Sequence, residues 1–318
     1  MRKERYIGLD KMITLATLAL MAFFYYGTHF LVTAVICVLT ALAAEFVSLR
    51  LMHKKIDADD LSCTSDALII ALMMPASINY LIAALAVIFG TVVAKNVFGG
   101  RQNMVFSPAA AAYIFVLTSW GRDLLMYPAP HVHTGIAGKA ADLVNSASHT
   151  FNMTGKMDYT DFEILMGNFS GPCGAVSILL LTVAAVMLIF RKDISFGAFF
   201  GTIIGTAAFA YITPMINDRT DSVKYSLVTN MVLFAAVFIV SDLRIAPRKW
   251  YFALFYGLFI GIFSYILVLT TAKENAVVIM SVLFTPLALG IRILEKKIRL
   301  ADDEDEEKPA VEAKEAAV

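Results

Sequence analysis

The sequence has little charge and few cysteines, and each shortage excludes a class of protein. Charged residues make up 16% of the 318 residues and hydrophobic residues 59%, whereas a soluble domain carries about 25% charged residues. The formal net charge is zero, so no excess of basic residues indicates a nucleic-acid partner. The three cysteines, Cys37, Cys63 and Cys173, lack any CxxC or metal-type spacing, and we expect them to be passive apolar residues.

The apolar residues occur in long blocks. A helix needs roughly 20 apolar residues to cross the hydrocarbon core of a bilayer. The blocks predict an all-α polytopic membrane protein with about ten transmembrane helices in one domain over residues 1–300, which contains an extracytoplasmic loop at 127–171. The segments that we interpret as spans are 12–26, 30–50, 64–78, 80–97, 107–126, 172–190, 195–213, 225–241, 250–271 and 275–294.

The basic residues favour one orientation of these spans. Cytoplasmic loops are enriched in lysine and arginine. If residue 1 is cytoplasmic, every inner connection carries basic residues and the outer connections carry few. We therefore expect both termini in the cytoplasm. The tail at 301–318, ADDEDEEKPAVEAKEAAV, has many charges and no apolar periodicity, which predicts a disordered acidic cytoplasmic tail.

Ten spans divide into two sets of five. An odd number of spans in each set places the second set upside down relative to the first. Faint echoes between the sets support this arrangement: VFSPAA at 105–110 begins the fifth span, and LFTPLA at 283–288 lies in the tenth. We therefore expect two inverted five-helix repeats.

The stretch GGRQNMVFSPAA at 99–110 places a polar turn and a proline at the start of the fifth span. Proline lacks an N–H group and disfavours a helical residue before it. Ser107 is suited to cap a helix whose first residue is Pro108. Two interpretations stay open: an ordinary cap at the membrane surface, or a helix break that lines a binding or conduction site.

Polar residues within or beside the spans are candidates for an ion pathway, because they are costly in lipid. Asp66, at the start of the third span, could cap that helix or bind a cation in a central cavity. Asp242, after the eighth span, could form an ion pair with Arg244. Asn230, deep in the eighth span, needs a polar partner. The candidates are Asp66, Asn230, Asp242 and Thr285.

Other polar residues have simpler interpretations. Glu45 lies near the end of the second span, where we expect it to extend to the interface, and Lys95 is expected to anchor the topology. The PHVH stretch at 130–133 lacks a third metal ligand, and no nucleophile lies beside a base. We predict no catalytic residue and no metal in this chain.

Four stretches of the sequence together resemble a known family. Their order and spacing are similar to those of the RnfD-type membrane subunit in Rnf electron transport complexes, and of the related NqrB-type membrane subunit in the sodium-pumping NADH:quinone oxidoreductase. The stretches are SDALIIALMMP at 65–75, GTVVAKNVFGGRQNMVFSPA at 90–109, GNFSGPCGAVSILLLTVAAVMLIFRKDIS at 167–195 and VSDLRIAP at 240–247.

The resemblance implies a membrane subunit that couples electron transfer to sodium or proton movement across the inner membrane of a prokaryote. Such a subunit is not catalytic alone and works with other membrane and peripheral subunits. The alternative function is a small-solute permease or channel on the same scaffold, without redox chemistry.

The resemblance also implies flavin cofactors, but this sequence departs at the relevant positions. The family carries FMN on a threonine of an outer loop, and that position falls on Ala140, which has no hydroxyl. The family's riboflavin lies near two asparagines, which fall on Met104 and Ser107, with Asn103 one residue out of register. We therefore expect that covalent FMN is lost. The residues of the flavin-lined helix break would be Gly99, Gly100, Asn103, Ser107 and Pro108.

A different alignment of the outer loop stays open. Moving the alignment by several residues would bring a hydroxyl to the flavin position, although none has the family's Gly-Ala context. The residues that would then be reached are Ser146, Ser148, Thr150 and Thr154.

Overall fold

The computed structural model describes residues 2–53, 62–98, 100, 104–130, 132–136 and 143–298. These residues are mainly helical, with one two-stranded sheet. The predicted tail at 301–318 and the residue Ala140 lie outside the described residues.

The first group of helices comes from the N-terminal part of the chain. Its longest members cover most of the first two predicted spans, and a π-helical segment continues directly from α4. The bounds are α1 Arg2–Tyr26, α2 Thr28–Leu51, α3 Ser62–Met73, α4 Tyr80–Ile88, the π-helical Phe89–Val97 and α5 Pro108–Ser119.

The second group comes from the C-terminal part. Two of its predicted spans are bent at short breaks, by 54° between α11 and α12 and by 47° after α14. The bounds are α9 Ile178–Arg191, α10 Phe196–Ile212, α11 Arg219–Val228, α12 Val232–Ala235, the π-helical Ala236–Val240, α13 Trp250–Thr271, α14 Ala276–Leu283 and a last helix Thr285–Ile298.

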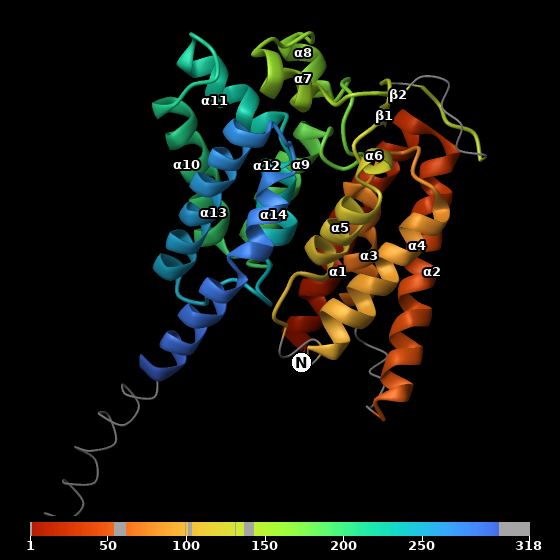
Figure 1. Ribbon diagram of the computed structural model, residues 1–318. Helices are drawn as coiled ribbons and strands as arrows, with labels where there is room; N and C mark the ends of the chain where they lie inside the picture. The colour runs from red at the N-terminus through yellow and green to blue at the C-terminus, as the bar shows by residue number, and fades with distance from the viewer. Residues whose placement is uncertain are drawn as a thin grey trace, which may run out of the picture.

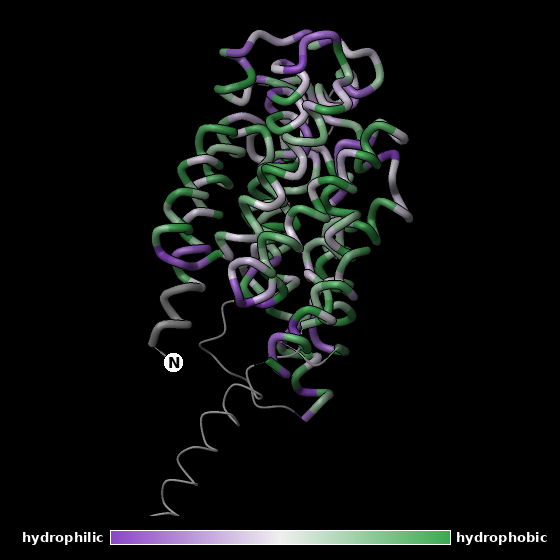
Figure 2. Tube along the Cα trace, turned by 90° about the vertical axis from the view of Figure 1, so that its left-hand side faces the viewer, coloured by the Kyte–Doolittle hydropathy of each residue, from purple (hydrophilic) through white to green (hydrophobic). Residues whose placement is uncertain are grey.

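The two groups stand side by side, with short elements across one end (Figure 1). We call this the loop end, and we call the opposite end, where α1 begins and the last helix finishes, the terminal end. Figure 2 shows hydrophobic residues through the middle of the molecule and hydrophilic residues at both ends. The loop end contains α6 Gly121–Leu124, β1 Tyr127–Pro128, β2 Leu143–Val144, α7 Ala147–Thr154 and α8 Asp161–Met166.

Length and hydropathy identify helices that can cross a membrane. Four helices are long and apolar enough, and the number rises to six if each bent pair is one span. Several of the remaining predicted spans contain apolar helices of 10–17 residues. The structure therefore confirms a helical membrane protein. The ten spans, the single domain over 1–300 and the inverted repeat stay predictions.

A turn that precedes α9 and contains Cys173 and Gly174 lies beside the end of α3. The N–H of Gly174 donates to the carbonyl oxygen of Leu72 at 2.7 Å, and the N–H of Cys173 donates to that of Met74 at 3.3 Å. The last carbonyls of a helix have no partner within the helix, and backbone polar groups at membrane depth must be satisfied inside the protein. The turn before α9 therefore completes the hydrogen bonding at the end of a helix in the first group.

Helices α10 and α13 pack closely against each other through small residues. A Cβ atom added at Gly201 would lie 2.3 Å from the carbonyl oxygen of Leu254, and one added at Gly257 would lie 2.3 Å from that of Ala198. Small residues let helix backbones approach in lipid, where packing replaces the hydrophobic effect as the driving force.

We predict that Gly201→Ala lowers the free energy of unfolding in detergent by about 1–3 kcal/mol, because the new methyl group overlaps a backbone atom that cannot move alone. Gly290→Ala is the matched control, since no atom lies within 4 Å of a Cβ there. Thermal unfolding of both variants measures the difference. Equal stability of the two would contradict the close approach of α10 and α13.

Candidate functional site

Four charged side chains from both groups meet at the terminal end, and we call them the Arg244 cluster. They are Lys11 of α1, Asp66 of α3, and Asp242 and Arg244 of the connection after the second π-helical segment. Arg244 binds Asp66 in a bidentate manner, with Nη1 at 2.9 Å from Oδ2 and Nη2 at 2.6 Å from Oδ1. Its Nε lies 3.0 Å from both carboxylate oxygens of Asp242. Lys11 Nζ reaches Asp242 Oδ2 at 3.0 Å.

The cluster balances two buried carboxylates with two cations. Asp66 and Asp242 are 4% and 6% exposed, and such burial disfavours a charge unless it is paired. Burial alone would raise the pKa of Asp242, but Arg244 and Lys11 hold that pKa well below its usual range. Burial would lower the pKa of Arg244, but Asp242 and Asp66 raise it well above its usual value. Asp242 and Arg244 are therefore both charged at neutral pH.

The last helix also contacts the cluster. Arg292 Nη1 donates to the carbonyl oxygen of Arg244 at 2.9 Å. Glu295 accepts hydrogen bonds from the N–H groups of Arg248 at 3.0 Å and Lys249 at 2.8 Å. The connection that carries Asp242 and Arg244 is thus held between α1, α3 and the last helix.

Two sequence-based interpretations are decided here. The ion pair between Asp242 and Arg244 is confirmed. The capping role for Asp66 is wrong, because α3 begins at Ser62 and Asp66 lies in its second turn. Its carboxylate is instead used by Arg244 of the other group.

A second buried ion pair joins α2 to the first π-helical segment. Lys95, which is 1% exposed, places its Nζ 2.8 Å from Oε1 of Glu45. Asn96 Nδ2 donates to Glu45 Oε2 at 3.0 Å and to Ser48 Oγ at 2.5 Å. The expectation that Glu45 extends to the interface is wrong, because these neighbours satisfy its carboxylate within the protein. Lys95 and Asn96 lie on a π-helical segment, and such segments often occur at functional sites.

The predicted helix start at Pro108 is confirmed, and it is buried. The Ser107 hydroxyl caps α5 by accepting a hydrogen bond from the N–H of Ala110 at 3.5 Å, and Ser107 is 7% exposed. A Cβ at Gly90 would lie 2.8 Å from the carbonyl oxygen of Pro108, so the break packs directly on the π-helical segment. This favours a break inside the protein over a cap at the membrane surface.

The other residues of the predicted flavin-lined break are only partly described. Gly99 and Asn103 lie outside the described residues. Gly100 has φ of +79°, which only glycine adopts readily, and a Cβ there would meet open space. Met104 is buried.

An apolar pocket of about 440 Å³ lies beside the break. Phe89 and Phe115 stack in it with ring centroids 4.5 Å apart. Thr118 is its one polar side chain among the described lining residues, and its hydroxyl donates to carbonyl oxygens of its own helix. A flavin ring system has polar edges that need hydrogen-bond partners, so the side chains described here do not fit one.

The candidates Asn230 and Thr285 lie at the two bends of the second group. Asn152 Nδ2 donates to Asn230 Oδ1 at 2.8 Å, which supplies the polar partner that Asn230 needs. Thr285, at the start of the last helix, donates to the carbonyl oxygen of Ser281 in α14 at 3.2 Å. Among the described contacts, neither residue is hydrogen-bonded to the Arg244 cluster. The structure thus brings together Asp66 and Asp242 and leaves the other two candidates apart.

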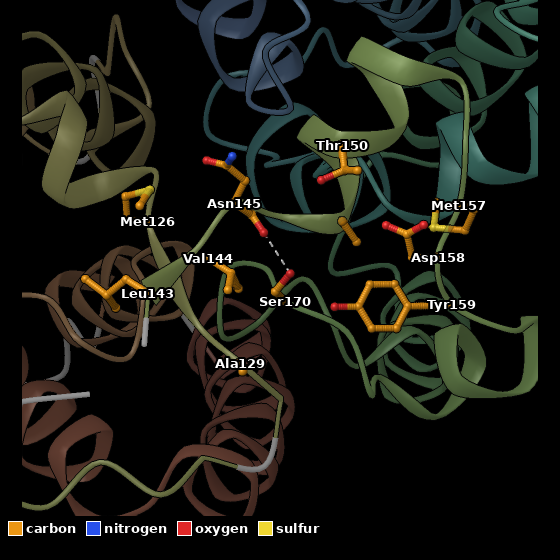
Figure 3. Close-up of a pocket in the computed structure, with 11 residues that line it drawn as sticks. Met126, Ala129, Leu143, Val144, Asn145, Thr150, Met157, Asp158, Tyr159 and Ser170 are labelled. Atoms are coloured by element: carbon orange, nitrogen blue, oxygen red, sulfur yellow. Dashed lines mark hydrogen bonds between the residues drawn. The ribbon is translucent and has the colours of Figure 1, made fainter. Parts of the chain in front are cut away.

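Figure 3 shows a pocket of about 470 Å³ at the loop end. This volume lies within the range of small-molecule sites. Thr150 of α7 and Tyr159 lie on its wall, and Ser170 Oγ donates to the carbonyl oxygen of Asn145 at 2.9 Å. Of the four alternative positions for flavin attachment, Thr150 lines this pocket. Ser146 and Ser148 are both 1% exposed.

Comparison with known proteins places the chain in a family. The model of the NQR2, RnfD, RnfE family matches residues 2–291. The chain belongs to this family. It is 27% identical over 279 residues to the D component of the ion-translocating oxidoreductase complex of Shewanella frigidimarina, and the match covers 77% of this chain and 79% of that protein.

Two further relatives are the B components of Na⁺-translocating NADH-quinone reductases. The chain is 23% identical over 233 residues to that of Yersinia pestis and 24% identical over 233 residues to that of Neisseria meningitidis. The matched parts cover 70% of this chain but only 55% and 56% of those proteins. The family expected from the sequence is therefore confirmed, at the modest identity of a divergent member.

We predict that Arg244→Gln lowers the free energy of unfolding by about 3–5 kcal/mol at pH 7, because it leaves a buried carboxylate unpaired. Arg244→Lys keeps the charge but loses the bidentate geometry, so its loss should be smaller. Lys224→Gln, which breaks the solvent-exposed pair with Asp161, is the control and should cost under about 1 kcal/mol.

The pH dependence of the same variants gives a separate check. The lowered pKa of Asp242 stabilises the fold above the unfolded pKa of about 4, and this stabilisation is lost as pH falls further. The difference between wild type and Arg244→Gln should therefore be greatest at neutral pH and shrink below about pH 4. A difference that grows on acidification would contradict this assignment of charges.

Proposed function

We propose that this chain is a membrane subunit of an ion-translocating oxidoreductase complex and couples electron transfer to ion movement. The family match over residues 2–291 supports this proposal, as do relatives that are named for such complexes. The comparisons give no support to the small-solute permease or channel.

The Arg244 cluster supports an ion pathway that is held closed at the terminal end. Asp66 and Asp242 could bind a cation, but Arg244 already occupies both carboxylates. A cation can replace the guanidinium only if the connection that carries Arg244 moves away from α3. Movement of a bistable connection under the influence of a partner subunit is how a redox event could open the pathway.

Similar contacts in the two groups support the inverted repeat. At the start of α2, His29 Nδ1 lies 2.6 Å from the carbonyl oxygen of Ala76, just after α3. At the start of α10, the N–H of Ser195 donates to the carbonyl oxygen of Ser241 at 2.8 Å, just after the second π-helical segment.

We place both termini in the cytoplasm of a prokaryote, with the chain in the inner membrane.

Electrons would reach the assembly through other membrane and peripheral subunits. The cysteines Cys37, Cys63 and Cys173 are separate and buried in the structure, which does not suit an iron–sulphur cluster. Covalent FMN does not fit Ala140, because alanine has no hydroxyl for a phosphoester. A non-covalent FMN or riboflavin would depend on the predicted residues Gly99, Gly100, Asn103, Ser107 and Pro108 rather than on the apolar pocket that Phe89 and Phe115 line.

We predict that the purified chain gives no fluorescent band under ultraviolet light on a denaturing gel, because Ala140 cannot carry the flavin. The positive control is the Shewanella frigidimarina relative, for which the family resemblance predicts a band. A fluorescent band from this chain would overturn the loss of covalent FMN, and Thr150→Val would then test the hydroxyl at the loop-end pocket.

The proposed function predicts that the chain, purified gently from native membranes, carries redox-active subunits with it. Membrane vesicles should take up Na⁺ or H⁺ when an electron donor is added. Arg244→Lys weakens the pairing that holds the pathway closed, so vesicles should lose the accumulated ion about tenfold faster if the opening barrier falls by about 1.4 kcal/mol. Lys224→Arg, at an exposed pair, is the matched control.

A different result would favour the alternative. A chain that purifies alone and carries a solute without any electron donor would contradict membership of an oxidoreductase complex and support the permease.

A further inference from the structure

A second buried carboxylate site lies at the loop end, at the opposite end of the bundle from the Arg244 cluster. Glu274 and Asn275 occupy the short connection between α13 and α14. The N–H of Met231, at the break between α11 and α12, donates to the carbonyl oxygen of Glu274 at 3.3 Å. The connection therefore lies against one of the two bent helix pairs.

Tyr113 and Tyr127 complete the site. We call these two residues, together with Glu274 and Asn275, the Glu274 site. The Tyr127 hydroxyl donates to Glu274 Oε1 at 2.6 Å, and Asn275 Nδ2 donates to the Tyr113 hydroxyl at 3.4 Å. All four residues are at most 3% exposed. They come from α5, β1 and the α13–α14 connection, so the site joins the two groups of helices.

Two oxygen atoms of this site have no hydrogen-bond partner among the described residues. They are Glu274 Oε2 and Asn275 Oδ1, on consecutive residues. An unsatisfied buried acceptor costs about 1–3 kcal/mol, and more when it is charged. Two such acceptors side by side in the chain indicate that a ligand supplies the missing contacts.

The charge of Glu274 is also uncompensated. The buried or part-buried carboxylates Asp66, Asp242 and Glu45 each bind a lysine or arginine. Glu274 has no such ion pair among the residues that the structure describes. Burial raises its pKa, whereas Ser146, Tyr127, His149 and Ser148 favour its charged form.

We propose that the Glu274 site binds one Na⁺ ion, with Glu274 Oε2 and Asn275 Oδ1 as ligands and with a proton as the competitor. Hard cations prefer oxygen ligands, and both atoms are oxygens without another partner among the described residues. One carboxylate and one monovalent cation leave the site neutral. Coupling ions in inverted-repeat transporters bind where helices are interrupted, and this site touches the break at Met231.

The site deepens the proposed function and rests on it for its biological meaning. The Glu274 site would be the ion-binding site at the loop end of the pathway, and Arg244 would hold the terminal end of that pathway closed. Acidification acts against the cation, because protonation of Glu274 removes the negative charge that binds it. Burial raises the pKa of Tyr127 well above its usual value, so its phenol stays neutral over the same range and remains available as a hydrogen-bonding group.

The test measures Na⁺ binding by the full chain, both alone and in its purified complex. Radioactive Na⁺ binding and the thermal unfolding temperature are followed as NaCl replaces choline chloride at constant ionic strength. A ligand that binds only the folded state raises its stability as its concentration exceeds Kd. We expect saturable binding near one ion per chain at pH 8, at least tenfold weaker binding at pH 5.5, and little response to choline.

Variants assign the ion to this site. Glu274→Gln should weaken Na⁺ binding by at least tenfold, and Tyr127→Phe, which keeps the packing, should weaken it several-fold. Asp221→Asn changes an exposed carboxylate at the same end and should bind Na⁺ like wild type. If Glu274→Gln does not fold, the Na⁺ affinities of Tyr127→Phe and Asp221→Asn are compared instead, and weaker binding by Tyr127→Phe assigns the ion to this site.

Three results would overturn the proposal: no saturable Na⁺ binding by wild type, unchanged binding by Glu274→Gln, or the same binding by Tyr127→Phe as by Asp221→Asn. Equal affinity for K⁺ would overturn the assignment to Na⁺. Because binding needs no electron donor, failure here leaves membership of the complex intact. Absence of partner subunits would remove the proposed function without changing the binding result.

Discussion

The ion pairs of Arg244 are the constraint on which the terminal end of the molecule depends. One guanidinium binds Asp66 of the first helix group and Asp242 of its own connection, so the two groups share a buried charge network. A buried carboxylate is costly unless it is paired, so loss of the guanidinium would leave Asp66 without its cation. The neighbouring contacts follow from it, since Lys11 balances the second carboxylate and Arg292 fixes the backbone of Arg244.

The loop end solves the same physical problem differently. There the buried carboxylate of Glu274 receives a tyrosine hydroxyl but no cationic side chain among the residues described. The Arg244 cluster thus carries its own cations, whereas the Glu274 site leaves a place that suits a mobile one. This asymmetry is what an ion pathway with one closed end and one binding station requires, and it needs no charged residue in the middle of the bilayer.

Much of the fold could be predicted because spans and helix caps are local features of the sequence. The helix start at Pro108 and the pair between Asp242 and Arg244 follow from residues a few positions apart. The partners of Asp66 and Glu274 could not be predicted, since Arg244 and Tyr127 lie 178 and 147 positions away. Apolar helices give no sign of which neighbours they pack against, and the same lack of signal led to the wrong expectation for Glu45.

The most direct measurement is a double-mutant cycle between Asp66 and Arg244, using Asp66→Asn, Arg244→Gln and the double variant in the purified complex. The free energy of unfolding and the donor-driven ion uptake are measured for each. We expect a coupling energy of about 2 kcal/mol or more, because removing one partner leaves the other charge buried and unpaired. Effects that add within about 0.5 kcal/mol would contradict a shared charge network between the two helix groups.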